Sequence, residues 1–107
     1  MTFHAFEVAL EMARSLEGPL ANLDQRDPDL ARQLRRAAAS VPLNVSEGSR
    51  RKGKDRLHLF RVAAGSADEV VACLRVAEAF GYLGADATAR TLGFCDRVLA
   101  MLWRLTH

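Results

Sequence analysis

Cysteine is scarce in this chain, which has only two cysteines among its 107 residues. Two thiols cannot build the disulfide framework that staples small secreted domains. Cys73 and Cys95 each lie among apolar residues in helical patterns. We therefore expect two buried, reduced thiols in a cytoplasmic protein, with a single bridge between them as the less favoured alternative.

Long apolar runs and strand patterns are also absent. No window approaches the ~18 uninterrupted apolar residues of a membrane span. Glu7, Glu11 and Arg14 interrupt the N-terminal segment, which excludes the apolar core of a signal peptide. No segment alternates with a period of two over the length of a strand, so we expect no sheet. Hydrophobic residues make up 50% of the chain, which favours one compact domain over residues 1–107.

Histidine is rare as well, with three residues in the chain. Asp55 and His58 have a spacing that two metal ligands on one helix share, but no Glu-x-x-His pair completes a site. Neither cysteine has an assignable histidine partner for nucleophilic catalysis. Gly48–Asp55 comes within one residue of a phosphate-binding loop, but Asp55 replaces the hydroxyl residue that binds magnesium, and a helix precedes it where a strand is needed. We expect no enzymatic activity, no metal and no cofactor.

What the chain does have is helical periodicity. Apolar residues recur at three- and four-residue steps over four stretches, at about 3–23, 28–48, 55–80 and 86–105. Gly18-Pro19 is expected to bend the first helix, because proline removes a backbone donor. Asp27 is a favourable N-cap for the second helix, with Pro28 at its first position. Short connections then specify an all-α, antiparallel up-down-up-down four-helix bundle about 30 Å long.

Two features of the sequence predict that some apolar surface is buried by contacts outside this bundle. Leu43 points away from the inward stripe of its helix, and the helix at 55–80 is apolar around more than half of its circumference. The small residues of Ala63–Ala67 allow another backbone to come close. We expect a homo-oligomer in which these surfaces meet. The candidate interface residues are Leu43, Val62, Gly65 and Ser66.

Positive charge is concentrated in the middle of the chain. Nine of the 15 Lys and Arg residues fall between Arg32 and Arg61, where only Glu47 and Asp55 oppose them. This window carries a net charge of +7 and the remainder −5, which sum to the formal +2 of the chain. A cationic surface on a small domain attracts phosphates, and nucleic acid is the commonest such partner. The alternative is that the run is a set of solvated helix faces.

We expect most of this charge to converge at one end of the bundle, where the second helix, its loop and the third helix meet. The candidate phosphate contacts are Arg35, Arg36, Arg50, Arg51, Lys52, Lys54 and Arg56. Glu47 is expected to pair with Arg50 or Arg51 as a structural group, and Asn44 to help bridge the backbone at Pro42. No aromatic residue for base stacking is interleaved in this stretch, so binding should be directed at the backbone and be weakly sequence-selective.

Several short motifs of the central region resemble one protein family. They are Gln33-Leu-Arg-Arg-Ala-Ala38, Ser40-Val41-Pro42, Asn44-Val-Ser-Glu-Gly48, Ala64-Gly-Ser66 with Glu69, and Gly81-Tyr82. The chain is similar to the four-helix-bundle proteins encoded by intervening sequences in bacterial 23S ribosomal RNA genes. That family also includes the accessory variability protein of diversity-generating retroelements.

The resemblance implies a homopentamer, a barrel of five bundles, without enzymatic activity. In the retroelement relatives a basic surface engages RNA and reverse transcriptase. The positions that match the shared polar region are Arg35, Arg36, Asn44, Glu47, Gly48 and Arg51. The family's usual Ser-x-x-Glu/Asp-Phe after the loop appears here as Gly53-Lys-Asp-Arg-Leu57, so the third helix should begin without a hydroxyl cap.

Two functional hypotheses follow. The first is a non-enzymatic, oligomeric nucleic-acid-binding module, with RNA as the favoured polymer. The second is a protein-interaction scaffold whose basic end docks an acidic partner such as a polymerase or reverse transcriptase.

Overall fold

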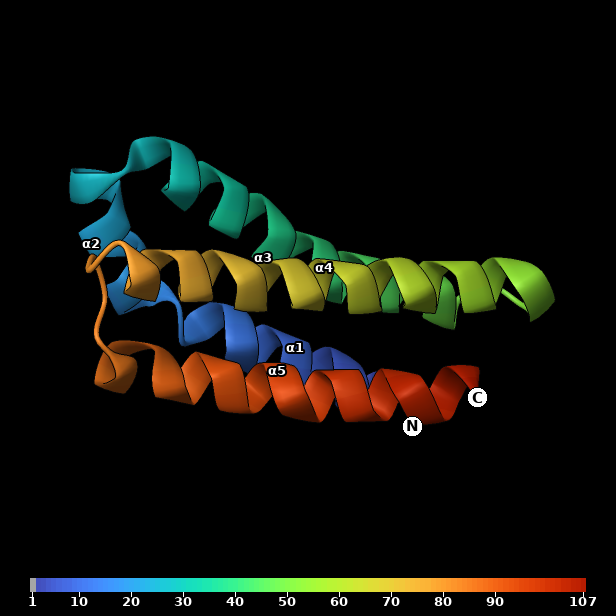
Figure 1. The fold of residues 1–107 in the computed structure, drawn as a ribbon. Coiled ribbons are helices and arrows are strands. Elements are labelled where there is room, and N and C mark those ends of the chain that lie inside the picture. Colours follow the sequence, from blue (N-terminus) through green and yellow to red (C-terminus); the bar gives the residue numbers. More distant parts are fainter. Residues whose placement is uncertain (1) are drawn as a thin grey trace.

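The computed structural model describes residues 2–107, so Met1 of the predicted domain lies outside it, and it describes side chains from His4 onward. This part of the chain is helical, without strands, as predicted (Figure 1). The helices are α1 (Thr2–Arg14), α2 (Glu17–Arg26), α3 (Pro28–Ser49), α4 (Gly53–Ala79) and α5 (Ala85–Thr106). None of the helices within residues 2–107 combines the length and apolar character needed to cross a bilayer.

The predicted first helix is two helices, and the break precedes the predicted bend. Pro19 is the third residue of α2, where its missing N–H removes no helical hydrogen bond. The break instead falls at Ser15 and Leu16. The Ser15 hydroxyl donates to the Met12 carbonyl at 2.6 Å and lies 2.7 Å from the Thr91 hydroxyl of α5. The break is therefore bonded to α5, a helix that packs beside α1.

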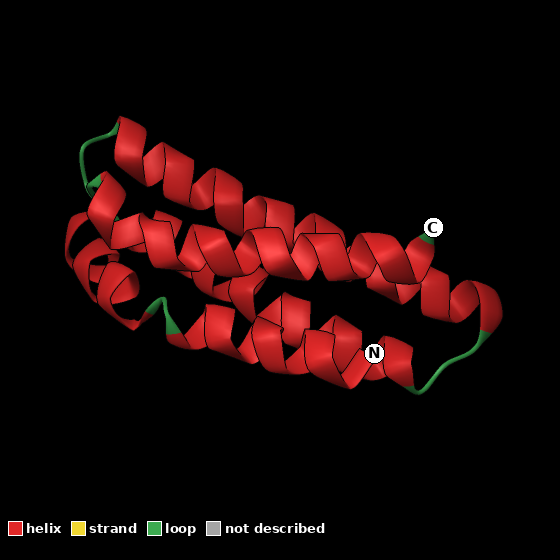
Figure 2. Ribbon diagram, turned by 90° about the horizontal axis from the view of Figure 1, so that it is seen from below, coloured by secondary structure: helices red, strands yellow, loops and turns green. Residues whose placement is uncertain are grey.

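The long helices form an antiparallel bundle in which α3 lies between α1 and α4, and α5 closes the ring between α4 and α1. Helix α2 packs mainly on α3 at one end (Figure 1). The molecule measures 42 × 22 × 19 Å, longer than the predicted bundle because α4, with 27 residues, extends over about 40 Å. The turn between α3 and α4 consequently projects beyond both termini (Figures 1 and 2).

The inward stripe of α3 includes Leu34, Ala37, Val41 and Val45, all of them buried. The broad apolar face of α4 is divided between two neighbours, since α4 packs on both α3 and α5. Much of the apolar surface of α4 is therefore buried against helices of its own chain. Phe80, the C-cap of α4, is 64% exposed, and Leu43 is 66% exposed, as predicted. The largest fully buried side chains include Phe60, Met12, Leu16, Leu23, Leu34, Leu74 and Leu102.

A polar network joins the middle of α3 to α4. The Asn44 amide donates to the Ser40 carbonyl at 2.8 Å and to the Ser40 hydroxyl at 2.9 Å. The Ser40 hydroxyl in turn lies 2.7 Å from the hydroxyl of Ser66. Asn44 and Ser40 therefore bond to each other beside Pro42, and Ser66, a candidate for the oligomer interface, is engaged within its own chain.

Close packing at the projecting end depends on Gly48. Gly48 is buried near the end of α3, and the ring of Phe60 from α4 lies against its backbone. A Cβ atom at residue 48 would stand 2.7 Å from Cε1 of Phe60, well inside van der Waals contact. Any side chain there must displace a fully buried ring.

We expect Gly48→Ala to lower the free energy of unfolding by about 1–3 kcal/mol, because the added methyl overpacks this contact. Urea unfolding followed by circular dichroism measures the change. The matched control is Gly65→Ala on α4, where a Cβ meets nothing within 4 Å, and where replacing a helical glycine should add about 0.5–1 kcal/mol. Equal effects of the two substitutions would contradict the packing described here.

Candidate nucleic-acid interface

The turn between α3 and α4 gathers exposed cations. Helical hydrogen bonds continue past Ser49, from the Arg50 and Arg51 amides to the carbonyls of Glu47 and Gly48. Gly53 then begins α4 with a φ of +59°, a left-handed conformation that suits glycine. We name as the cationic turn the residues Arg50, Arg51, Lys52, Lys54 and Arg56. Lys52 is the N-cap of α4 and gives no side-chain cap, as the departure from the family pattern predicted.

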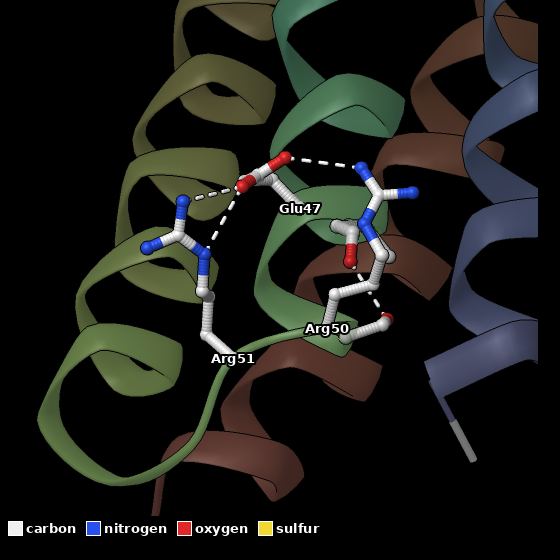
Figure 3. Close-up of polar contacts among 5 residues, drawn as sticks. Glu47, Arg50 and Arg51 are labelled. Carbon is white, nitrogen blue, oxygen red and sulfur yellow. Dashed lines mark hydrogen bonds and ion pairs between the residues drawn. The ribbon is translucent and has the colours of Figure 1, made fainter.

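Glu47 pairs with both arginines of the turn (Figure 3). Its carboxylate accepts from Arg51 Nη2 at 2.7 Å and Nε at 3.1 Å, and from Arg50 Nη2 at 3.1 Å. The hydrogen bonds from Arg51 and then Arg50 lower the pKa of Glu47. The predicted pairing is confirmed with both partners at once. One carboxylate shared by two guanidinium groups leaves this trio with a net charge of +1.

The other cations of the turn have different surroundings. Lys52 and Lys54 are exposed, and no ion pair joins either of them to a carboxylate in the part of the chain that the structure describes. Arg56 is half-buried, with its guanidinium carbon 5.4 Å from the ring centroid of Phe60. It packs over the end of the core as a cation–π contact. The two lysines are thus the least engaged cations of the cationic turn.

Arg35 and Arg36 do not lie at this end, so the predicted convergence of all seven cations is wrong. They precede Arg50 by about 14 residues on one continuous helix, which separates them by about 21 Å. Arg35 instead makes two hydrogen bonds to Asp24 of α2, at 3.0 and 3.2 Å. These bonds lower the pKa of Asp24 and raise that of Arg35.

Arg36 lies on another part of the surface. It lines an open cavity of about 410 Å³ between α3 and α4, together with Gln33, Ser40, Ser66 and Glu69. The cavity therefore brings one cation and one carboxylate together, a mixed surface without a net positive charge.

The groups considered for metal binding and catalysis lie in two kinds of place, a surface cavity and the core. Asp55 and His58 line a cavity of about 200 Å³ with Glu47, Arg51 and Leu59. Within residues 2–107, no group of three or more metal-ligating side chains comes together. The two cysteines are buried and unpaired, as predicted. Burial raises the pKa of both thiols, that of Cys95 to about 12, so the nucleophilic thiolate is disfavoured at both positions.

Sequence reasoning missed one exposed residue at this end of the bundle. Trp103 of α5 is 62% exposed and lines a cavity together with Arg61 of α4. The signal available in the sequence was a single tryptophan at the margin of the apolar side of its helix. Its proximity to a cation 42 residues earlier was not readable from the sequence.

The shared carboxylate gives a pH prediction. The pKa of Glu47 should rise toward its ordinary value in Arg51→Ala, and rise less in Arg50→Ala, because Arg51 donates the larger share of the hydrogen bonding. Carboxyl-detected NMR titration measures both shifts. Pairing lowers the pKa of Glu47 in the folded protein, so the stabilisation by the two arginines is complete at pH values above the ordinary carboxyl pKa. This stabilisation is lost as the pH falls through the lowered pKa. An ordinary pKa for Glu47 in the unsubstituted protein would contradict the geometry.

Comparison with known proteins gives one family and one fold. A crystal structure at 1.70 Å resolution, of a protein of unknown function from the S23 ribosomal protein family of Bacteroides thetaiotaomicron VPI-5482, matches with a TM-score of 0.87 and 16% identity. The match covers 95% of this chain and 97% of that one, and at this identity it concerns the fold alone. No curated protein sequence matches. The sequence model of the 23S rRNA-intervening sequence protein family matches residues 3–104, and the chain therefore belongs to that family.

Proposed function

We propose that this protein is a non-enzymatic, oligomeric module that binds RNA through its phosphates at the cationic turn. The observation that carries the proposal is the position of Lys52 and Lys54, which are exposed on a turn that projects beyond both termini and have no carboxylate partner among the described residues. A phosphate backbone can approach such a projection from several directions. Contacts of this kind provide affinity without reading sequence.

Arg50 and Arg51 are available to the same partner despite their pairing with Glu47. Exposed ion pairs are weak because water and salt screen them. A phosphate offers guanidinium groups the same bidentate geometry as a carboxylate and carries a comparable charge. An arriving phosphate can thus take one arginine while Glu47 keeps and orients the other. Glu47 acts in this proposal as a positioning group.

The proposed contact set is smaller than the sequence suggested. Arg35 is excluded by its position, because it lies more than about 20 Å along α3 from the turn, where it pairs with Asp24. Arg36 stays a separate cation on α3, about 21 Å from the turn. The contacts are therefore Arg50, Arg51, Lys52 and Lys54, with Arg56 at the margin against Phe60. Family membership supports RNA as the polymer, because the resemblance implies RNA binding in retroelement relatives.

The proposal includes self-assembly, with the pentamer of the resemblance as the expected state. Leu43 offers an exposed apolar anchor on the outer face of α3, and Val62 is half-buried on α4. Ser66 is already bonded to Ser40, and Gly65 opens onto the groove between α4 and α5. Leu43 and Val62 are thus the stronger candidates for contacts between copies. Five cationic turns on one particle would multiply a weak affinity through avidity.

The test is an affinity measurement at several salt concentrations with a labelled structured RNA. Tight binding at low salt should weaken steeply, because bound phosphates release counterions. In the double variant Lys52→Gln, Lys54→Gln the slope of log affinity against log salt should fall by about 1.4, or about 0.7 for each phosphate of a single strand that a lysine no longer neutralises.

The control is the double variant Arg90→Gln, Arg97→Gln on α5, which removes the same charge away from the turn. Its slope and affinity should match those of the unsubstituted protein, and the mass in solution should be unchanged in all three proteins. Absence of RNA binding at low salt, or equal reductions in affinity in both variants, would refute the proposal.

The second candidate function is a scaffold that docks an acidic protein, favoured by the exposed Leu43 on the same helix face as Arg32 and Arg36. Reversing Arg50, Arg51 and Lys52 to glutamate separates the two functions. Loss of RNA retention with an unchanged oligomer supports the RNA-binding module. RNA retention that survives the reversal favours the scaffold.

A further inference from the structure

The chain's only tryptophan stands exposed near the end that carries the cationic turn. Trp103 is 62% exposed, and its indole stacks on the imidazole of His107, with ring centroids 3.4 Å apart and planes at 18°. Nδ1 of His107 lies 3.1 Å from the Trp103 carbonyl and 3.0 Å from the Thr106 hydroxyl, which fixes the imidazole in this position. The stacked indole and imidazole present a largely exposed aromatic surface.

A cavity of about 480 Å³ lies beside this surface, between α4 and α5. Its lining is apolar at Ala64, Leu99 and Leu102 and polar at Asp68 and Thr106. Gly65 lines it without a side chain, and a Cβ at that residue would meet nothing within 4 Å. A cavity with an aromatic wall and a few polar groups is the usual shape of a site for a small planar group.

Arg61 connects this cavity to the cationic turn. It lines the cavity and belongs to the same positively charged window of the sequence. It lies eight residues after Gly53 on α4, so the two sites are about 12 Å apart along the helix. No ion pair engages Arg61 in the portion of the chain described. A strand bound by its phosphates at the turn can therefore continue to Arg61.

We propose that the Trp103 cavity receives an unpaired base of a single-stranded RNA whose phosphates lie along Arg61 and the cationic turn. The base stacks on the indole, Arg61 contacts the neighbouring phosphate, and the Asp68 carboxylate accepts a hydrogen bond from an amino or imino group of the base. This inference rests on the proposed function and adds a ligand class to it. The sequence predicted contacts to the RNA backbone alone, because Trp103 comes from a segment distant from the positively charged window. The proposed site adds a contact to a base.

The lone tryptophan makes the test direct, because all indole fluorescence comes from the site. The probe is a ten-nucleotide oligoadenylate at low salt, with an RNA duplex of equal length as the control. Oligoadenylate should quench the fluorescence in proportion to the fraction bound, whereas the duplex, whose bases are already stacked, should bind through phosphates without quenching. Binding of oligoadenylate without any quenching would overturn the inference.

Substitutions separate stacking from phosphate contact. Trp103→Ala should weaken oligoadenylate binding about tenfold, because stacking on one aromatic side chain contributes about 1–3 kcal/mol per base. Trp103→Phe should restore part of the affinity, and Gly65→Leu should fill the cavity and weaken binding to a similar degree. Phe80→Ala is the matched control, since Phe80 is 64% exposed but lies at the opposite end of α4. Duplex affinity should be unchanged in all four variants.

The failures are distinguishable. If oligoadenylate binding is abolished by Lys52→Gln, Lys54→Gln but is unchanged by Trp103→Ala, the cavity is refuted and the proposed function stands. If neither RNA binds, both are refuted. If Trp103→Ala and Gly65→Leu change the mass of the oligomer, or a protein partner's affinity, without changing RNA affinity, this surface is a protein interface and the inference is wrong.

Discussion

The antiparallel packing of α3 on α4 is the constraint on which the other features depend. The two helices approach closely at their projecting end because Gly48 presents bare backbone to the ring of Phe60. The hydrogen bonds among Asn44, Ser40 and Ser66 hold the same pair of helices near their middle. Together these contacts keep the two helices packed on each other up to the turn, which projects beyond the rest of the bundle. A looser pair would leave the cations of the turn on a mobile loop, where ordering them on a ligand would cost conformational entropy.

Charge on this surface is arranged by local pairing rather than by simple accumulation. Carboxylates engage four of the arginines in the positive window, with Asp29 on Arg32, Asp24 on Arg35, and Glu47 on both Arg50 and Arg51. Asp24 holds a single guanidinium through two bonds, whereas Glu47 is divided between two. The net positive charge therefore survives at the turn and is largely cancelled near α2. Position along α3, and not the number of cations, decides where positive charge is left uncancelled.

Local signals in the sequence predicted most of the fold. The N-cap at Asp27 and Pro28 at the first position of α3 are both found as expected, with the Asp27 carboxylate accepting from the Leu30 amide at 3.1 Å. The break in the first helix was predicted at Gly18-Pro19 and lies at Ser15. The prediction was wrong because the hydroxyl of Thr91, on a helix distant in sequence, takes part in the break. We expected a neighbouring copy to cover part of the wide apolar face of α4. Helical periodicity shows how wide that face is, but it does not show that α3 and α5 both pack on it.

The candidate site was predictable only in part for the same reason. Glu47, Arg50 and Arg51 are near neighbours on one helical turn, so their pairing follows from spacing. The separation of Arg35 from the turn also followed from helix rise, but a count of charges in a window ignores it. The contact of Arg35 with Asp24 and the meeting of Trp103 with Arg61 depend on how whole helices pack, which no local pattern contains.

Lysine footprinting tests the central claim most directly, because the chain has two lysines and both belong to the cationic turn. An amine-reactive reagent, with peptide mass spectrometry, reports the modification rates of Lys52 and Lys54 with and without bound RNA. If phosphates lie on the turn, RNA slows the modification of both lysines, and added salt restores the original rates. Unchanged rates while RNA is bound would show that the polyanion lies elsewhere on the molecule.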